Sequence, residues 1–191
     1  MPYGLRPVHG AIGNLHPVEY PVADSYAGNI FSGDFVERLV NGTVQRQETT
    51  TGLSPVGSHP TLGIATGFRY VDASGTPQWS NYYPASGGTD IFVTVHEDPD
   101  QIYLIQSDGN TTSADVGDNA TVAGFAASAG STATGNSGAY LSHSTIGQGA
   151  LTLRIVGIPE DGSNENLTAD KNVLVKILPA VLQGVLSDQI P

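Results

Sequence analysis

Turn-forming residues interrupt this chain so often that long helices have little room to form. Its 191 residues include 24 glycines and 12 prolines, and both residue types disfavour the interior of a helix. Short runs rich in valine, isoleucine, threonine and aromatic residues lie between them, a pattern typical of strands joined by turns. The length favours one domain. We therefore predict an all-β fold with a single compact β-barrel or sandwich-like domain.

The clearest local signal is the pair Asn41-Gly42, which lies between two strand-like runs at 33–40 and 43–46. An Asn-Gly pair favours the tight turn of a hairpin, because both residues tolerate positive φ angles. The sequence therefore predicts a hairpin across these two runs.

Five further runs have the residue pattern of strands. Gly63 and Gly67 interrupt the first of them, and this pattern predicts a strand with a β-bulge at a glycine. An acidic turn joins the second and third runs, so we expect both in the core sheet. After the last run, the apolar segment 180–186 could form a short helix or another extended segment. The five runs are 62–71, 90–95, 101–106, 151–158 and 173–178.

Two segments have no sustained apolar period. Residues 1–29 contain four prolines and predict an extended N-terminal arm, laid over its own domain or over a neighbour. Residues 123–149 consist largely of alanine, glycine, serine and threonine, and predict a long flexible or interface loop. The β domain is therefore expected to span 30–191, with the arm contributing surface rather than core.

Charge and composition argue against several partners. The 18 acidic and 7 basic residues give a formal charge of −11, which repels phosphate backbones, so we expect no nucleic-acid binding. No stretch approaches the ~20 apolar residues of a membrane-spanning helix, so we expect no membrane association. The chain has no cysteine, which excludes disulfides and thiolate metal sites. Stability must come from the core or from oligomerisation.

Sequence signals for catalysis or metal binding are weak. Gly135-Asn136-Ser137-Gly138-Ala139 is similar to the nucleophile segment of trypsin-like proteases, but it departs at Asn136 and Ala139, and no histidine motif accompanies it. Oxygen-rich turns between 90 and 118 could hold calcium, yet the ligand spacing of a calcium loop is absent. The five histidines lack ligand spacing. We predict no enzyme activity, no cofactor and no metal. The histidines are His9, His16, His59, His96 and His143, and the acidic residues of these turns include Glu97, Asp98, Asp100, Asp108 and Asp115.

An aromatic cluster is a further candidate for binding. Trp79, Tyr82 and Tyr83 are close together in the sequence. They could cap one end of the β core, anchor a protein interface, or form a platform for sugars.

Phrases along most of the chain resemble small structural proteins of the virions of tailed phages, especially marine phages. The phrases are Pro2-Tyr3-Gly4-Leu5-Arg6-Pro7-Val8, Ser32-Gly33-Asp34-Phe35-Val36 with Asn41-Gly42-Thr43-Val44, Gly67-Phe68-Arg69-Tyr70, Asp98-Pro99 before Ile102-Tyr103-Leu104-Ile105-Gln106, and Ser137-Gly138.

The resemblance implies a head decoration or cement protein, made in the host cytoplasm. Such a protein would sit on the outer capsid surface, bind the major capsid protein, stabilise the head and form a homo-oligomer, with a trimer favoured. The missing basic patch suits a surface away from packaged DNA. We expect partner contacts at Tyr3, Leu5, Arg6, Pro7, Val8, Trp79 and Tyr82.

Two other roles stay open from the sequence. A tail- or fibre-associated structural protein would act as an adhesin, with Trp79 and its neighbouring tyrosines binding host surface glycans. A hydrolase would depend on Ser137 as nucleophile.

Overall fold

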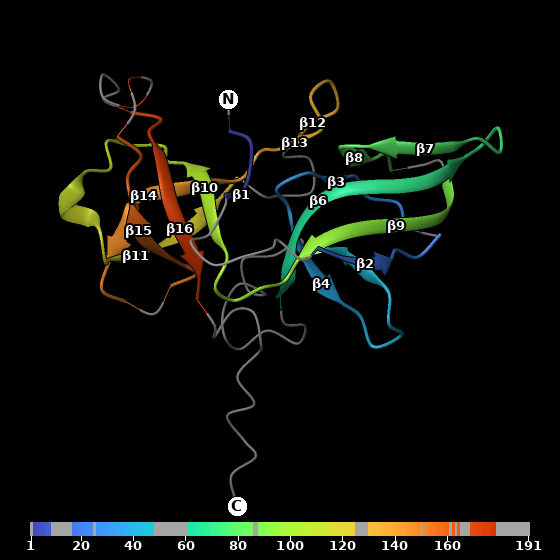
Figure 1. Cartoon of the computed structure of the whole chain (residues 1–191), viewed down its shortest axis with the longest axis horizontal. Coiled ribbons are helices and arrows are strands. Elements are labelled where there is room, and N and C mark those ends of the chain that lie inside the picture. Colours follow the sequence, from blue (N-terminus) through green and yellow to red (C-terminus); the bar gives the residue numbers. More distant parts are fainter. Residues whose placement is uncertain are drawn as a thin grey trace, which may run out of the picture.

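Two six-stranded antiparallel sheets make up most of the computed structural model (Figure 1). The structure describes residues 2–8, 17–24, 26–47, 61–85, 88–124, 130–149, 151–160, 162, 164 and 169–178. Within these residues the fold is all-β, and the sheets pack into a sandwich-like domain. The only helical element described is a 3-10 turn at Ser113–Asp115, and no described helix could cross a membrane.

The first sheet has the strand order β1-β10-β16-β15-β11-β14. Its strands alternate buried and less buried residues, so one face carries the apolar core. Leu141, Leu153 and Val175 belong to that core and are completely buried. The strands are β1 (Arg6–Val8), β10 (Ile102–Gln106), β16 (Asn172–Ile177), β15 (Leu153–Gly157), β11 (Asn119–Ala123) and β14 (Tyr140–Gly147).

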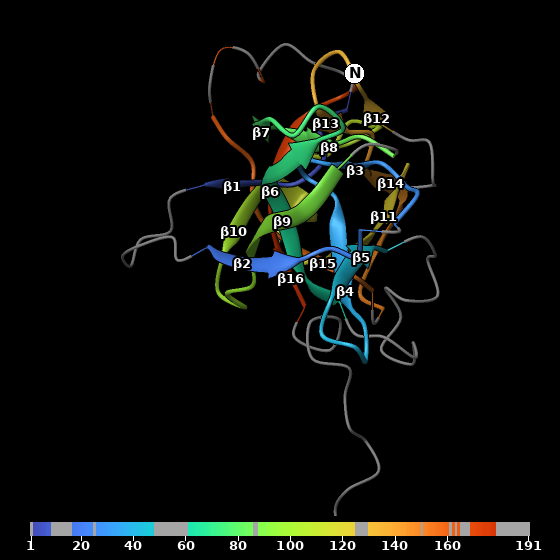
Figure 2. The ribbon, with the colours of Figure 1, turned by 90° about the vertical axis from the view of Figure 1, so that its right-hand side faces the viewer.

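The second sheet has the order β2-β9-β6-β4-β5, and β7 pairs with the C-terminal part of β6. Figure 2 faces this sheet and shows the long strands β6 and β9 side by side. Its core includes Ile91, Val93 and Val95. The strands are β2 (Val18–Pro21), β9 (Gly88–His96), β6 (Thr61–Asp72), β4 (Phe35–Arg38), β5 (Val44–Arg46) and β7 (Pro77–Ser80).

Two short ladders complete the described strands. β3 (Ile30–Phe31) pairs with β8 (Tyr82–Tyr83), and β12 (Gly130–Ser131) pairs with β13 (Asn136–Ser137). An isolated bridge between Ser32 and Asn136 joins the two ladders.

Both large sheets are rolled. An isolated bridge joins Val22 to Val44 in the second sheet, and another joins Ser107 to Leu141 in the first. One bridge does not make a continuous ladder, so neither sheet closes within the described residues. Of the two predicted architectures, the sandwich-like one is confirmed and the closed barrel is not formed.

The predicted hairpin and bulge are confirmed. β4 and β5 pair antiparallel around Asn41-Gly42, and Gly42 has a φ of 86°. The pairing of β6 with β9 shifts register between Ala65 and Gly67, so a bulge lies at the second of the two glycines.

Two expectations from the sequence need correction, and a third cannot be compared with the described residues. The runs at 90–95 and 101–106 lie in different sheets, because the turn between them crosses from β9 to β10. The segment 123–149 is not one long loop, since β12, β13 and all of β14 lie within it. Small residues permit close backbone approach there, as where Gly130 lies against the ring of Phe31. The segment 180–186 lies outside the described residues.

The N-terminal segment is also more integrated than an arm. β1 and β2 add strands to the two large sheets, and Leu5 and Val22 are buried in the two cores. Its described residues therefore pack in cis and contribute to the core. Removal of residues 1–24 would expose both cores. A truncated chain therefore cannot be used to test a surface role of this segment alone.

A short hub, residues 32–34, connects distant parts of the chain by backbone hydrogen bonds. The Ser32 carbonyl accepts from Ser137 N–H at 2.8 Å, and the Gly33 carbonyl accepts from Leu5 N–H at 3.1 Å. Gly33 N–H and the Asp34 carbonyl both bond to Ala65 of β6, at 2.8 and 2.9 Å. The hub therefore joins the N-terminal segment, the second sheet and the β13 region.

Close backbone approach makes glycine necessary in this hub. Gly33 has a φ of 92°, and a Cβ atom there would lie 2.8 Å from the Tyr3 carbonyl oxygen and 2.9 Å from the Gly4 Cα. Gly42 has a similar φ of 86° but no atom within 4 Å of such a Cβ. The two glycines thus share a backbone conformation and differ in packing.

This difference predicts unequal costs for the same substitution. Gly42→Ala should lower the free energy of unfolding by about 1 kcal/mol, since only left-handed strain is added. Gly33→Ala should cost about 1–3 kcal/mol more, because backbone atoms must also move. Urea denaturation of both variants measures the difference. Equal costs would contradict a tightly packed hub.

Candidate functional site

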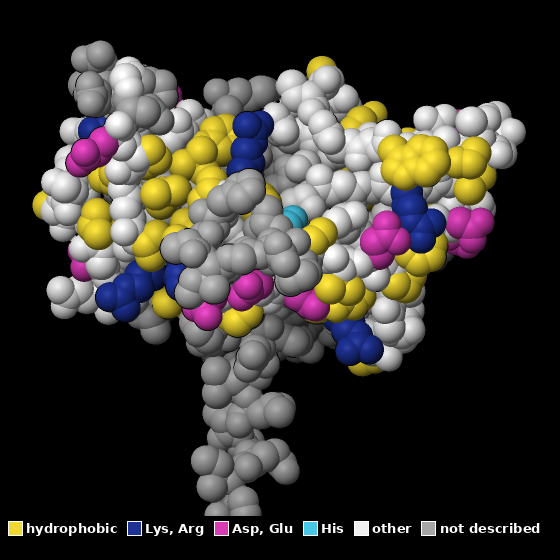
Figure 3. Space-filling model, in the orientation of Figure 1, with side chains coloured by type: hydrophobic (Ala, Val, Ile, Leu, Met, Phe, Trp, Pro, Cys, Tyr) yellow, Lys and Arg dark blue, Asp and Glu magenta, His cyan; other side chains and the backbone are white. Residues whose placement is uncertain are grey.

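A cross-strand row of side chains marks the outer face of the second sheet. Trp79 of β7 lies opposite Arg69 of β6, which lies opposite Phe92 of β9. Residues directly opposite in a ladder share a face, so the three side chains lie together. Trp79 is 76% exposed, unusual for the largest apolar side chain. Figure 3 shows hydrophobic side chains beside basic and acidic ones over this part of the molecule.

Arg69 is held in one orientation. Its guanidinium lies 3.8 Å from the centre of the Phe92 ring, and its Nε and Nη2 atoms donate to the Glu19 carboxylate at 3.0–3.2 Å. Both charged groups are roughly half exposed, so water and salt weaken the pair. The pair contributes little to stability, but it fixes donors and acceptors on an open surface.

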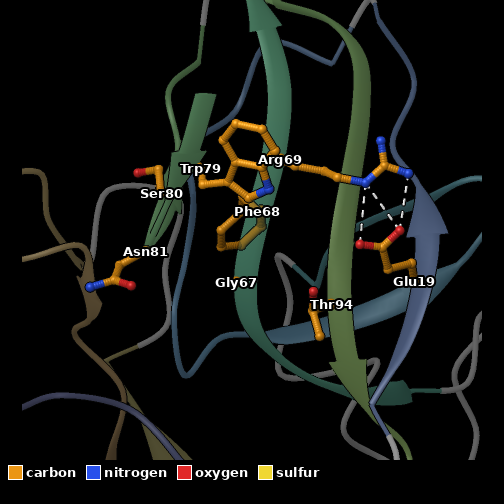
Figure 4. Close-up of a pocket in the computed structure, with 8 residues that line it drawn as sticks. All are labelled: Glu19, Gly67, Phe68, Arg69, Trp79, Ser80, Asn81 and Thr94. Carbon is orange, nitrogen blue, oxygen red and sulfur yellow. Dashed lines mark hydrogen bonds and ion pairs between the residues drawn. The ribbon is translucent and has the colours of Figure 1, made fainter. Parts of the chain in front are cut away.

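A hollow of about 410 Å³ opens beside the Trp79 indole (Figure 4). Gly67 helps to create it, because even an added Cβ there would meet only Thr94, at 3.8 Å. Figure 4 shows Ser80 and Asn81 on one side of the indole and the Arg69–Glu19 pair on the other. The hollow is lined by Glu19, Gly67, Phe68, Arg69, Trp79, Ser80, Asn81 and Thr94. We call it the Trp79 hollow.

Only one of the three predicted aromatic residues reaches this surface. Tyr83 is 1% exposed and belongs to the core of the second sheet. Tyr82 is partly buried and stacks on Phe31 with ring centres 5.7 Å apart. The cluster is therefore divided, with the two tyrosines packed inward and Trp79 directed outward.

A second surface forms around β1, in the other large sheet. The Arg6 guanidinium lies 4.4 Å from the centre of the Tyr3 ring, and the Tyr3 hydroxyl donates to Asn172 Oδ1 at 2.6 Å. Burial raises the pKa of Tyr3 to about 12, with Arg6 opposing the shift. Pro7 and Val8 are partly buried. Leu5, also predicted as a contact, is only 1% exposed, so it is a core residue in this fold.

The candidate nucleophile Ser137 lies inside the protein. It is 1% exposed, and its Oγ accepts the Ala139 N–H at 3.1 Å. The same hydroxyl hydrogen-bonds the Asp34 carboxyl. A substrate has no access to this oxygen in the folded chain, so its environment is that of a structural serine.

The candidate metal ligands do not converge. His96 and His143 lie in different sheets, while His9, His16 and His59 lie outside the described residues. The acidic turn residues bond to separate partners, as Asp100 does to Lys176 and Asp108 to the backbone N–H of His143. Within the described part of the chain, no three histidine or acidic side chains are grouped to hold a metal ion.

Sequence reasoning missed a buried ion pair beside the hub. Arg46 Nη1 lies 3.9 Å from Asp34 Oδ2, and both side chains are 1% exposed. Among the described residues, this pair is the only polar interaction of the Arg46 guanidinium. The alternation of side chains along a strand could have indicated that Arg46 is buried, because Val44 and Arg46 occupy the same inward face of β5.

Comparisons with known proteins give no relative: no family model, curated protein or solved structure matches this chain. Its function must therefore be inferred from the two surfaces.

The buried Asp34 predicts an unusual pH dependence. Burial raises the pKa of Asp34 to about 6, while hydrogen bonds from Ser137 and Phe31 and the charge of Arg46 oppose the shift. The folded state then binds this proton more tightly than the unfolded chain. The contribution of Asp34 to the free energy of unfolding should rise as pH falls from about 7 to about 4, by roughly 3 kcal/mol.

Urea denaturation of the wild type and Asp34→Asn across that pH range isolates this contribution. The wild type should gain stability relative to the variant on acidification. A relative loss would mean instead that Arg46 holds the carboxyl ionised.

Proposed function

We propose that the protein is a non-enzymatic virion protein, namely a phage capsid decoration or cement protein. In this role it binds the outer surface of the major capsid shell, stabilises the head and associates with itself, most simply as a trimer. The sequence resemblance to phage virion proteins supports the proposal, and the negative charge suits a position away from packaged DNA.

The single observation that supports attachment is the open edge at β1. This strand ends the first sheet and pairs only with β10 among the described residues. Its second edge can add a strand from a partner, since an edge strand carries unpaired backbone groups. Pro7 lacks an N–H, which limits indiscriminate pairing along the edge.

Side chains at this edge suit a protein partner. Tyr3 and Arg6 stack on each other, and both residue types are enriched at protein interfaces. Arg6 is exposed on a strand fixed in the sheet, so it is ordered before a partner binds. We assign capsid attachment to the β1 edge, and Trp79 to a separate surface in the other sheet.

A second candidate function is a tail- or fibre-associated adhesin that binds host surface glycans. The Trp79 hollow favours it, because an exposed indole lies beside several polar side chains in an open depression. The two candidates differ in which surface carries the essential contact.

Cosedimentation with capsid shells that lack the protein tests attachment. The wild type should bind at a saturable, fixed ratio to capsid subunits. Arg6→Glu should weaken binding at least tenfold, because it reverses the charge at the β1 edge. Arg38→Glu makes the same charge change at an exposed position on β4 and should bind like the wild type.

Light scattering of the free protein provides the oligomeric state, and a trimer mass would support attachment at threefold positions. Absence of binding to shells would overturn the decoration role and favour the adhesin. Equal losses in the two arginine variants would show that overall charge, rather than the β1 edge, controls attachment.

A further inference from the structure

The Trp79 hollow has the chemistry of a sugar site, and we infer that it binds neutral hexopyranose units of a surface glycan. The inference rests on the glycan-binding alternative above and is independent of capsid attachment. The ligand class and the residues of the hollow can be tested separately.

The indole supplies the apolar part of such a site. A pyranose ring has one face of C–H groups and a rim of hydroxyls, so it can stack on a flat aromatic surface. Trp79 is 76% exposed and stands on a paired strand, so its ring is presented to solvent from an ordered backbone. Burying an indole against a C–H face removes apolar area from water.

Polar side chains that could bond sugar hydroxyls line the hollow beside the indole. The Asn81 amide and the Thr94 hydroxyl make no hydrogen bond within the described part of the chain, so both can bond sugar hydroxyls. The Ser80 hydroxyl accepts the Tyr82 N–H at 3.2 Å and keeps its own proton to donate. A few fixed polar groups around an apolar surface are what orient a ligand in a binding site.

The charge balance of the hollow selects a neutral ligand. The one cationic side chain that lines it, Arg69, already pairs with Glu19 through two of its nitrogens. An acidic sugar would have to displace Glu19 and approach a chain of formal charge −11. A neutral hydroxyl can instead accept from Arg69 Nη1 or donate to Glu19 with the ion pair intact.

The shape of the hollow favours a unit within a glycan chain. It is an open depression on the outer face of a sheet, and the row Trp79, Arg69 and Phe92 continues across that face. Neighbouring sugar units can therefore extend past the stacked one. Single open sites of this kind bind weakly, and several copies in an oligomer would raise the avidity.

The single tryptophan of the chain makes the test site-specific. Neutral oligosaccharides of glucose, galactose and mannose, and matched oligosaccharides of uronic and sialic acids, are titrated into the full-length protein while tryptophan fluorescence is recorded. We expect a saturable change with at least one neutral series and none with the acidic series. Asn81→Ala keeps the fluorophore and should weaken binding about tenfold.

Immobilised forms of the same sugars test Trp79 itself. Trp79→Ala should abolish retention, whereas Val40→Ala, which shortens a fully exposed apolar side chain at the hairpin tip, should leave it unchanged. Circular dichroism and urea denaturation establish that both variants fold. Three results would each overturn the inference: no binding to any neutral series, a preference for the acidic series, or retention that survives Trp79→Ala.

Capsid cosedimentation of Trp79→Ala separates this inference from the decoration role. Unchanged attachment to shells, with loss of sugar binding, supports two independent surfaces. Loss of attachment would show that the hollow also contacts the shell and would overturn the independence of the two surfaces.

Discussion

Close backbone packing at residues 32–34 is the constraint on which the rest of the fold depends. Hydrogen bonds from this hub hold Leu5, Ala65 and Ser137, which come from three distant parts of the chain. The contact of Gly33 with Gly4 leaves no room for a side chain. Because the hub fixes the N-terminal segment, it also places β1 at the edge of the first sheet.

The buried Arg46–Asp34 pair adds a polar constraint at the same place. Removing two charges from water is costly, and the single contact of 3.9 Å offsets that cost only partly. Arg46 therefore adds little to stability by itself. Its effect is specificity, since any arrangement that separates it from Asp34 would leave a buried charge without a partner. The pair thereby restricts how β5 can pack against the hub.

The two candidate surfaces depend on different features of the sheets. The β1 edge offers backbone groups and a stacked Tyr3–Arg6 pair, which suits a protein strand. The Trp79 hollow offers an indole and several side-chain donors and acceptors, which suits a small polar ring. Because they lie in two different sheets, the proposed attachment at the β1 edge and the proposed sugar site would not compete for the same surface.

The sequence by itself determined the all-β class, the hairpin at Asn41-Gly42 and a bulge at a glycine of β6, because turn geometry and residue alternation act over a few neighbouring residues. It also identified Trp79 as a candidate for binding. Only the tertiary structure decided that Leu5 is core, that Tyr82 and Tyr83 pack inward, and that β9 and β10 belong to different sheets. Those outcomes depend on contacts between residues far apart in the chain, which no local pattern encodes. The burial of Arg46 lies between these two cases. Strand alternation indicates that its side chain faces inward, but only the tertiary structure shows that Asp34 is its partner.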